Sequence, residues 1–427
     1  MSGTSCCPAL YALFFLVVAC MLKTAVGWGA NSVDESYRPS RGYLTAFPST
    51  PTTTVSNGGS ITDAIYGCDG KVGSGNYCLI EVQGTPVQET VYIARSRTKL
   101  LGNSATMTGS GQSYRFIQVD SGTSEVVIEG MEIVGHQGND VTGIAVDGTN
   151  IEKVAMINNH IHDFDGDAGG AHAIVVLGGP GAGVKEVIIQ GNLVENMKTG
   201  YSESIAMNGN IEGFEIIRND VVFVNNIAID AIGGEGVGGT TTENGRVLPH
   251  PDDSARFGFI ENNFVGDMST RNNPAYPDPE EAWSAAFYVD GASNIKVAYN
   301  EVEDSSWGFE IGSENCKIVQ DITMMGNKAS GSYFGDAVFG GYASTGYLAD
   351  TSIGCDPTST VDNDEGHGYV QRITVTGNNF TTTNPTVEKV FLQKRITYAI
   401  IAAPGVDPVN ANGDGSASGD QNAIRTS

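Results

Sequence analysis

One short pattern recurs along most of the chain: two or three apolar residues, a polar residue, Gly or Asn, then Asn, any residue and an apolar residue. Examples are VVIEGMEI, AMINNHI, VIIQGNLV and EIIRNDV, and further copies continue as far as TVTGNNF. The aligned positions are Met131, Asn159, Asn192, Asn219, Asn263, Asn300, Asn327 and Asn378, at spacings of 28, 33, 27, 44, 37, 27 and 51 residues. A base period near 27 with longer intervals is typical of a solenoid whose extra residues form loops at the turns.

The repeated segments favour β-structure over helix. They are short, rich in Val and Ile, and bounded by Gly and Asn, and none keeps a helical period over three turns. Gly and Asn tolerate the left-handed backbone that tight corners between sheets require. Asn side chains at equivalent corners can also hydrogen-bond along the stack of coils. The repeat therefore predicts a β-solenoid.

These units resemble the parallel β-helix (PbH1) repeats of the pectin-lyase-like superfamily, whose coil carries the pattern apolar-x-apolar-x-Gly-Asn-x-apolar. The resemblance covers about residues 80–400 and implies an all-β fold, a single-stranded right-handed parallel β-helix with an N-terminal cap. The middle section, from NNIAIDAIGGEG to WGFEIGSEN, is also similar to a group of secreted bacterial β-helix proteins. That group is described mostly by its fold, so the resemblance implies no particular activity.

The two ends of the chain differ in composition from the repeats. The apolar run ALYALFFLVVACML at residues 9–22 is too short to span a bilayer comfortably and is followed by small residues. We interpret residues 1–29 as a secretory signal cleaved near Gly27 or Ala30, with a retained membrane anchor as the alternative. We expect a cap and first coils at 30–100, the β-helix at 101–403, and a polar, glycine-rich, disordered tail at 404–427.

Four cysteines lie beyond the predicted signal, and an oxidising route of export predicts two disulfides. Pairing in sequence order joins Cys68 to Cys78 and Cys316 to Cys355, which is one of three connectivities. We therefore expect a secreted protein of the cell wall or extracellular matrix.

The net charge of -26, from 49 acidic and 23 basic residues, bears on the partners. An average field of that sign repels nucleic acid and anionic membranes, so neither is expected to bind. Neutral glycans meet no such repulsion, whereas an anionic polysaccharide needs a local basic patch or bridging calcium. We expect a monomer that binds or acts on an extracellular polysaccharide.

A second strand in each coil ends in glycine, as in GIAVDG, AIVVLGG, SIAMNG, AIDAIGG and AFYVDG. Alignment on that glycine places these residues in one inward column: Val146, Val176, Met207, Ala231 and Val289. The flanking positions then point outward, because strand side chains alternate between faces. With coils ~4.8 Å apart, Asp230 should lie beside Tyr288, with Asp290 diagonal to it and Glu310 on the next coil. The interpretation is that Asp230 faces outward and is not buried.

Two long insertions, after the Asp230 strand and before the Tyr288 strand, should form walls beside this floor. Glycoside hydrolysis needs one carboxyl group of raised pKa and one ionised carboxylate, which makes Asp230, Asp290 and Glu310 the predicted catalytic residues. Predicted substrate-binding residues are Glu235, Tyr288, Tyr276, Trp283, Trp307, Glu314 and Arg271.

Two other functions fit the same residues. A calcium-dependent lyase or epimerase would use Tyr288 as base or acid, and Arg271, Arg256 or Lys296 to neutralise a uronate carboxylate. A non-catalytic cell-wall or matrix protein would bind glycan through the same acidic and aromatic surface. The simplest alternative to both enzymes is that the carboxylates are solvated members of a very acidic surface.

Calcium is the only cofactor that the sequence suggests. The segment HDFDGDAGGAH holds Asp163, Asp165 and Asp167 at alternate positions, which can present several oxygens to Ca²⁺. It lacks the distal Glu of a complete calcium loop, and a polar turn is the alternative. We interpret His160, His162 and His172, which cluster in the same region, as residues without a metal-binding spacing.

Overall fold

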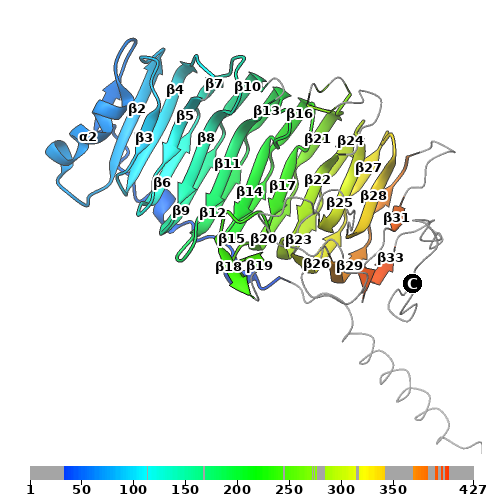
Figure 1. Cartoon of the computed structure of the whole chain (residues 1–427). Coiled ribbons are helices and arrows are strands. Elements are labelled where there is room, and N and C mark those ends of the chain that lie inside the picture. Colours follow the sequence, from blue (N-terminus) through cyan, green and yellow to red (C-terminus); the bar gives the residue numbers. More distant parts are fainter. Residues whose placement is uncertain are drawn as a thin grey trace, which may run out of the picture.

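The computed structural model describes residues 33–112, 114–166, 169–243, 246–271, 273, 275–276, 284–313, 317–341, 369–382, 390–392, 396–397 and 400–402. Within these residues the chain forms a right-handed parallel β-helix, which confirms the predicted fold class (Figure 1). Each coil crosses three faces in turn, and the strands of each face pair in parallel with those of the neighbouring coils. We call these the first, second and third faces in chain order.

The first face comprises β1 (Thr53–Val55), β2 (Cys78–Gly84), β4 (Thr98–Thr108), β6 (Ser124–Glu129), β9 (Ile151–Ile157), β12 (Val184–Gln190), β15 (Ile211–Ile217), β20 (Ala255–Glu261), β23 (Ser293–Ala298), β26 (Ile318–Met325), β29 (Tyr369–Thr376), β32 (Ile396–Thr397) and β33 (Ile400–Ala402). The second face comprises the end of β4, β7 (Glu132–Val134), β10 (His160–Asp165), β13 (Leu193–Lys198), β16 (Asp220–Val224), β21 (Phe264–Met268), β24 (Glu301–Glu303), β27 (Lys328–Ser330) and β30 (Asn379–Phe380). The third face is a ten-stranded sheet of β3 (Val91–Ile93), β5 (Tyr114–Val119), β8 (Val141–Gly148), β11 (Ala171–Gly178), β14 (Ile205–Gly209), β17 (Ile229–Ile232), β22 (Ala285–Asp290), β25 (Trp307–Ser313), β28 (Gly335–Gly341) and β31 (Val390–Leu392).

The asparagines of the repeat form a buried ladder at the corner between the first and second faces. At each step the backbone N–H and the Nδ2 of one Asn donate to Oδ1 of the next, both at 2.9 Å from Asn192 to Asn219. The ladder runs from Asn159 to Asn378, and the N–H of Met131 donates to its first member. Hydrogen bonding along the stack is thus confirmed.

The residue before each ladder position explains the Gly or Asn of the pattern. All of these residues adopt a left-handed backbone, with φ between 53° and 68°: Gly130, Asn158, Gly191, Arg218, Asn262, Tyr299, Gly326 and Gly377. Gly and Asn adopt this conformation at least cost. Arg218 and Tyr299 show that the corner also accepts other residues.

The interior is a stack of apolar columns. The predicted inward column, from Val146 through Val176 and Met207 to Ala231 and Val289, is in register along the third face and belongs to the main core cluster. Each of these five side chains is at most 1% exposed. The prediction of the inward column is therefore confirmed.

The N-terminal end of the solenoid is covered by a helix that the sequence analysis did not identify. Helix α2 (Ile61–Val72) begins after Ser60, whose Oγ accepts from the N–H of Asp63 at 3.0 Å. Its Ile61 and Ile65 are buried against the first coils. Cys68 on this helix is disulfide-bonded to Cys78 on β2, which confirms that pairing. Cys316 and Cys355 lie outside the described residues.

The segment from residue 33 to 47, with η1 (Glu35–Tyr37) and η2 (Gly42–Thr45), packs along the outside of the first face. Arg38 donates to Glu215 on β15 and Glu261 on β20, both at 2.8 Å. A pocket of about 430 Å³ lies beside this segment, lined in part by Arg38, Arg41 and Glu215. No helix in the described part of the chain is long and apolar enough to cross a membrane, and the predicted signal falls outside that part.

Candidate functional site

The predicted alignment of the acidic and aromatic residues on the third face is confirmed. Asp230 on β17 is the direct neighbour of Tyr288 on β22, and Tyr288 is the neighbour of Glu310 on β25. Asp290 lies two residues beyond Tyr288, so its side chain shares the outer side of the sheet. Three neighbouring strands thus present three carboxyl groups and one phenol on one side.

The expectation that Asp230 is not buried is wrong. Asp230 is 2% exposed, Tyr288 2%, Glu310 3% and Asp290 5%, although these side chains stand outside the apolar core. Outer apolar clusters flank them at both ends along the helix axis, with Ala206 in one and Trp307 in the other. The short side chain of Asp230 is shielded from water by larger neighbours even though it points away from the core. The alternation of strand faces predicts the direction of the side chain but not this shielding.

Glu235 follows β17 in the loop that the insertion begins. Its Oε2 accepts from Nδ2 of Asn208 on β14 at 2.6 Å. The side chain is in contact with solvent, yet desolvation by the surrounding protein raises the pKa of its carboxyl group, and the charge of Asp253 raises it further. Glu235 is therefore an acid that keeps its proton to higher pH than usual and remains accessible.

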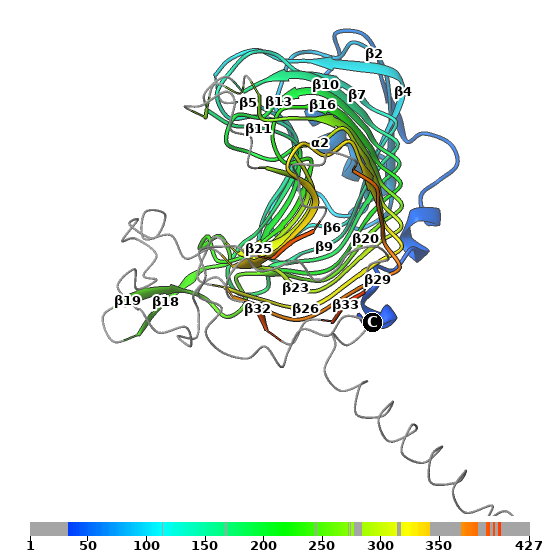
Figure 2. The ribbon, with the colours of Figure 1, turned by 90° about the vertical axis from the view of Figure 1, so that its right-hand side faces the viewer.

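Asp253 holds the loop that carries Glu235. It is fully buried, and its carboxylate accepts from the N–H of Gly236 at 2.7 Å and of Gly238 at 2.6 Å. Sequence reasoning missed this residue, because its partners lie 15 and 17 positions earlier in an insertion outside the repeat. Between them the insertion forms the hairpin of β18 (Thr240–Glu243) and β19 (Arg246–Pro249), which projects from the coil (Figure 2).

Aromatic residues lie in the turns that lead onto the third face. Tyr276 packs against Tyr201, with ring centroids 5.8 Å apart, and the guanidinium of Arg271 lies 4.3 Å from the ring centre of Tyr333. Tyr201 and Tyr333 are 63% and 47% exposed. Neither was predicted, since a lone tyrosine in a turn carries no sequence signal.

The other predicted binding residues are placed differently. Trp307 is 9% exposed and stacks on Phe334, with centroids 5.8 Å apart, so most of its ring is covered. Trp283 and Glu314 lie outside the described residues. Arg256 and Lys296, considered for a lyase, lie on strands of the first face and pair with glutamates there.

Of the predicted calcium ligands, Asp163 and Asp165 lie on β10 and Asp167 is outside the described residues. Asp163 accepts from His162 at 2.9 Å, and Asp165 accepts from Lys198 at 3.0 Å. Both carboxylates thus accept hydrogen bonds from side-chain nitrogen atoms. The calcium site of Asp163, Asp165 and Asp167 stays a prediction.

The registers and outer columns define a parallel β-helix protein with a group of buried carboxylates on its third face. No family model matches the chain. The "Uncharacterized protein YwoF" of Bacillus subtilis (strain 168) is 35% identical over 226 residues, which span 52% of this chain and 45% of that protein. This chain therefore covers less than half of the length of that relative.

Solved structures with related folds share little sequence. The A-module of mannuronan C-5 epimerase AlgE4 from Azotobacter vinelandii has 10% identity and a TM-score of 0.49, over 82% of this chain and 94% of its own. The GH136 lacto-N-biosidase from Eubacterium ramulus has 12% identity and a TM-score of 0.46, over 82% of this chain and 63% of its own. At these scores the likenesses carry no argument about activity.

Proposed function

We propose that this protein is a secreted glycoside hydrolase that acts on polysaccharide along the outer side of the third face. The observation that carries the proposal is the burial of Asp230, Asp290 and Glu310 on the outside of the solenoid. Removing a carboxylate from water is costly. Solvated members of an acidic surface would stay exposed, so their burial favours a chemical role.

In this proposal Glu235 is the proton donor and Asp230 the general base. Glu235 is accessible and has a raised pKa, as a general acid requires. Its hydrogen-bond partner Asn208 lies diagonally across from Asp230 on the neighbouring strand, which brings the carboxyl group of Glu235 to the same outer side of the third face. We assign the pair to the inverting class, in which the two carboxyl groups stand about 6.5–9.5 Å apart with room for a water molecule.

The reaction then proceeds in one displacement. Glu235 gives its proton to the leaving glycosidic oxygen, while Asp230 takes a proton from the water that attacks the anomeric carbon. Asp290 and Glu310 lie on the same outer side as Asp230, where their carboxyl groups would stabilise the positive charge that develops on the sugar ring. The anomeric configuration is inverted.

A neutral polymer fits this surface best. Exposed Tyr201 and Tyr333 flank the third face several coils apart, which suits stacking on a chain laid along the helix axis. A net charge of -26 disfavours a polyanion. Elimination from a uronate requires a cation beside the base. Arg256 and Lys296 are paired on another face, and Arg271 lies over the ring of Tyr333 in a turn beside the third face. The Cys68–Cys78 disulfide fits secretion.

The test is a panel of neutral and uronic polysaccharides, assayed for new reducing ends and for the ultraviolet absorbance of unsaturated products. We expect reducing ends without absorbance from a neutral glycan, and a loss of roughly 10²–10⁴-fold in Glu235→Gln and in Asp230→Asn. Glu152→Gln is the control, because Glu152 is an exposed carboxylate on the first face.

The pH profile separates chemistry from binding. Because Glu235 must be protonated to donate, activity should fall as the pH rises through its raised pKa, and Glu235→Gln should abolish that limb. Unsaturated products would establish the lyase instead. Retention on a glycan gel with neither new reducing ends nor unsaturated products would establish a binding module and refute the proposed hydrolase activity.

A further inference from the structure

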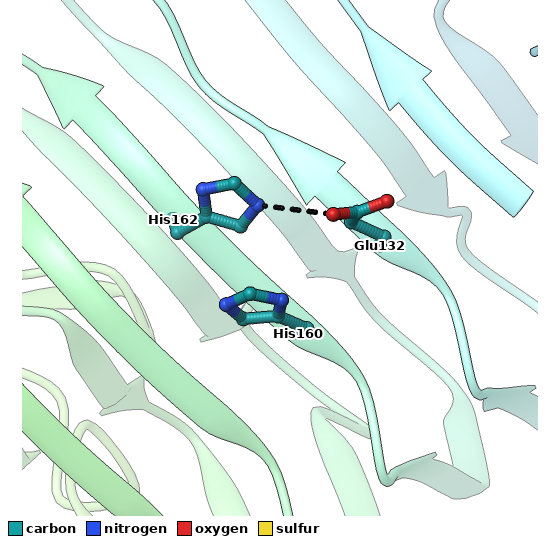
Figure 3. A group of neighbouring side chains, drawn as sticks. All are labelled: Glu132, His160 and His162. Carbon is teal, nitrogen blue, oxygen red and sulfur yellow. Dashed lines mark ion pairs between the residues drawn. The ribbon is translucent and has the colours of Figure 1, made fainter. Parts of the chain in front are cut away.

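A second group of polar side chains lies on the outer side of the second face, away from the carboxylates of the third (Figure 3). His160 and His162 are two residues apart on β10, so both project from the same side of the strand. Glu132 on β7 is the direct neighbour of His160, and Glu195 on β13 is the direct neighbour of His162. Three consecutive coils therefore contribute to one cluster.

The spacing of the nitrogen and oxygen atoms suits a shared metal ion. One ligand atom from each of Glu132, His160 and His162 lies within 4.8 Å of the others. Nε2 of His162 and Oε1 of Glu132 are 3.5 Å apart, longer than a good hydrogen bond. Two ligands held 2.0–2.2 Å from a tetrahedral zinc ion are about 3.4 Å apart. Small side-chain rotations close the remaining gap to His160.

The hydrogen bonds behind the histidines orient them as metal ligands. Nδ1–H of His162 donates to Oδ2 of Asp163 at 2.9 Å, which leaves the Nε2 lone pair directed toward Glu132. That Nε2 is shielded from solvent and makes no hydrogen bond to any residue that the structure describes. Nε2–H of His160 donates to Glu195 at 2.7 Å, which leaves a lone pair on its Nδ1. Carboxylate partners of this kind are usual behind metal-bound histidines.

We propose that Glu132, His160 and His162 bind a divalent transition metal ion, with zinc as the expected occupant. Two imidazole nitrogens and one carboxylate oxygen are a ligand set that zinc accepts, with water in the fourth position. Imidazole ligands favour zinc, copper or nickel over calcium and magnesium, which prefer oxygen. The ion would link the β7 and β10 coils and is independent of the hydrolase proposed for the third face.

The electrostatic surroundings favour a cation. Glu132, Glu195 and Asp163 bring three carboxylates to two histidines. The hydroxyl of Thr106 donates a hydrogen bond to Oε2 of Glu132 and orients its carboxyl group. The two imidazole rings stack with centroids 4.1 Å apart, which holds both histidines side by side in the cluster.

The test uses the full secreted chain without a histidine tag, freed of metal with a chelator. Zn²⁺ is titrated by calorimetry, and Co²⁺ is followed by its visible absorbance as a second probe. We expect one site in the wild type whose affinity falls at least tenfold in His162→Gln and in Glu132→Gln. Asp163→Asn, which removes only the orienting carboxylate, should weaken binding by roughly 10–100-fold.

The matched control is His250→Gln, because Nδ1 of His250 lies 3.6 Å from a carboxylate oxygen of Asp252 outside the cluster. It should bind Zn²⁺ like the wild type. A rise in melting temperature with Zn²⁺ that is lost in His162→Gln supports the site independently. Equal zinc affinity of the wild type and His162→Gln, or loss in His250→Gln alone, would overturn the proposal.

Discussion

Asn219 lies in the middle of the buried ladder, and replacing it with alanine removes four hydrogen bonds. Its Oδ1 accepts from the N–H and from Nδ2 of Asn192, each at 2.9 Å. Its Nδ2 donates to the carbonyl of Ile189 and to Oδ1 of Asn263, each at 3.0 Å. Each bond contributes about 1 kcal/mol net, and a buried donor left unpaired costs more. We therefore expect Asn219→Ala to lower the free energy of unfolding by about 4 kcal/mol.

Equilibrium denaturation in urea measures this loss, and amide hydrogen exchange locates it. Protection should fall first at the N–H of Asn192, because its acceptor is gone. Asn103→Ala is the control: Asn103 is exposed and its amide bonds only the side chain of Glu81, so a change within about 0.5 kcal/mol is expected. A loss below 1 kcal/mol in Asn219→Ala, with unchanged exchange at Asn192, would refute the view that the ladder stabilises the stack.

Three further outcomes follow from other contacts. Arg38→Met should lower the free energy of unfolding, measured by urea denaturation, by about 2–3 kcal/mol, because the buried Glu215 and Glu261 each lose a partner. Arg38→Lys keeps the charge, and an equal loss of stability in the two variants would contradict this reason. Reducing the Cys68–Cys78 bond, with a separation of 10 residues, should cost about 3 kcal/mol, and unchanged thermal melts with reductant would disprove it. Burial lowers the pKa of His172, so stability should fall as the pH drops from 6.5 through the folded-state pKa. His172→Gln should flatten that decline between pH 7 and 5, and a parallel decline would argue against it.

Much of the fold was predictable because the repeat encodes geometry directly. An Asn at each corner, preceded by a residue with a left-handed backbone, fixes where every coil turns. Glycines at strand ends then fix the register of the third face. The segment from residue 33 to 47 was not predictable in this way. Arg38 meets Glu215 across 177 positions, and no local pattern marks such a contact.

In the candidate sites, too, the repeat predicted which residues are neighbours but not how they pack. The register identified the neighbours of Asp230, but its burial depends on how outer side chains such as Tyr288 pack around it. His160 and His162 were interpreted as lacking a metal-binding spacing, because the third proposed ligand, Glu132, comes from the preceding coil. Pairing the two coils in register, as the Asn ladder does, would have brought Glu132 beside His160.

The position of Asp230 in an otherwise apolar outer column supports the proposed chemical role. In this solenoid the inward columns form the main core cluster, and outer positions of the third face form smaller apolar clusters beside it. At the positions equivalent to Asp230, the preceding coils carry Val175 and Ala206, which pack in an apolar cluster. Asp230 thus interrupts an outer apolar column, where a buried carboxylate is costly unless the surrounding groups compensate it. We therefore expect Asp230→Val to abolish hydrolysis, and its melting temperature measures what the contacts of the carboxylate contribute to the fold. A variant that loses stability and keeps activity would show that the carboxylate has a structural role.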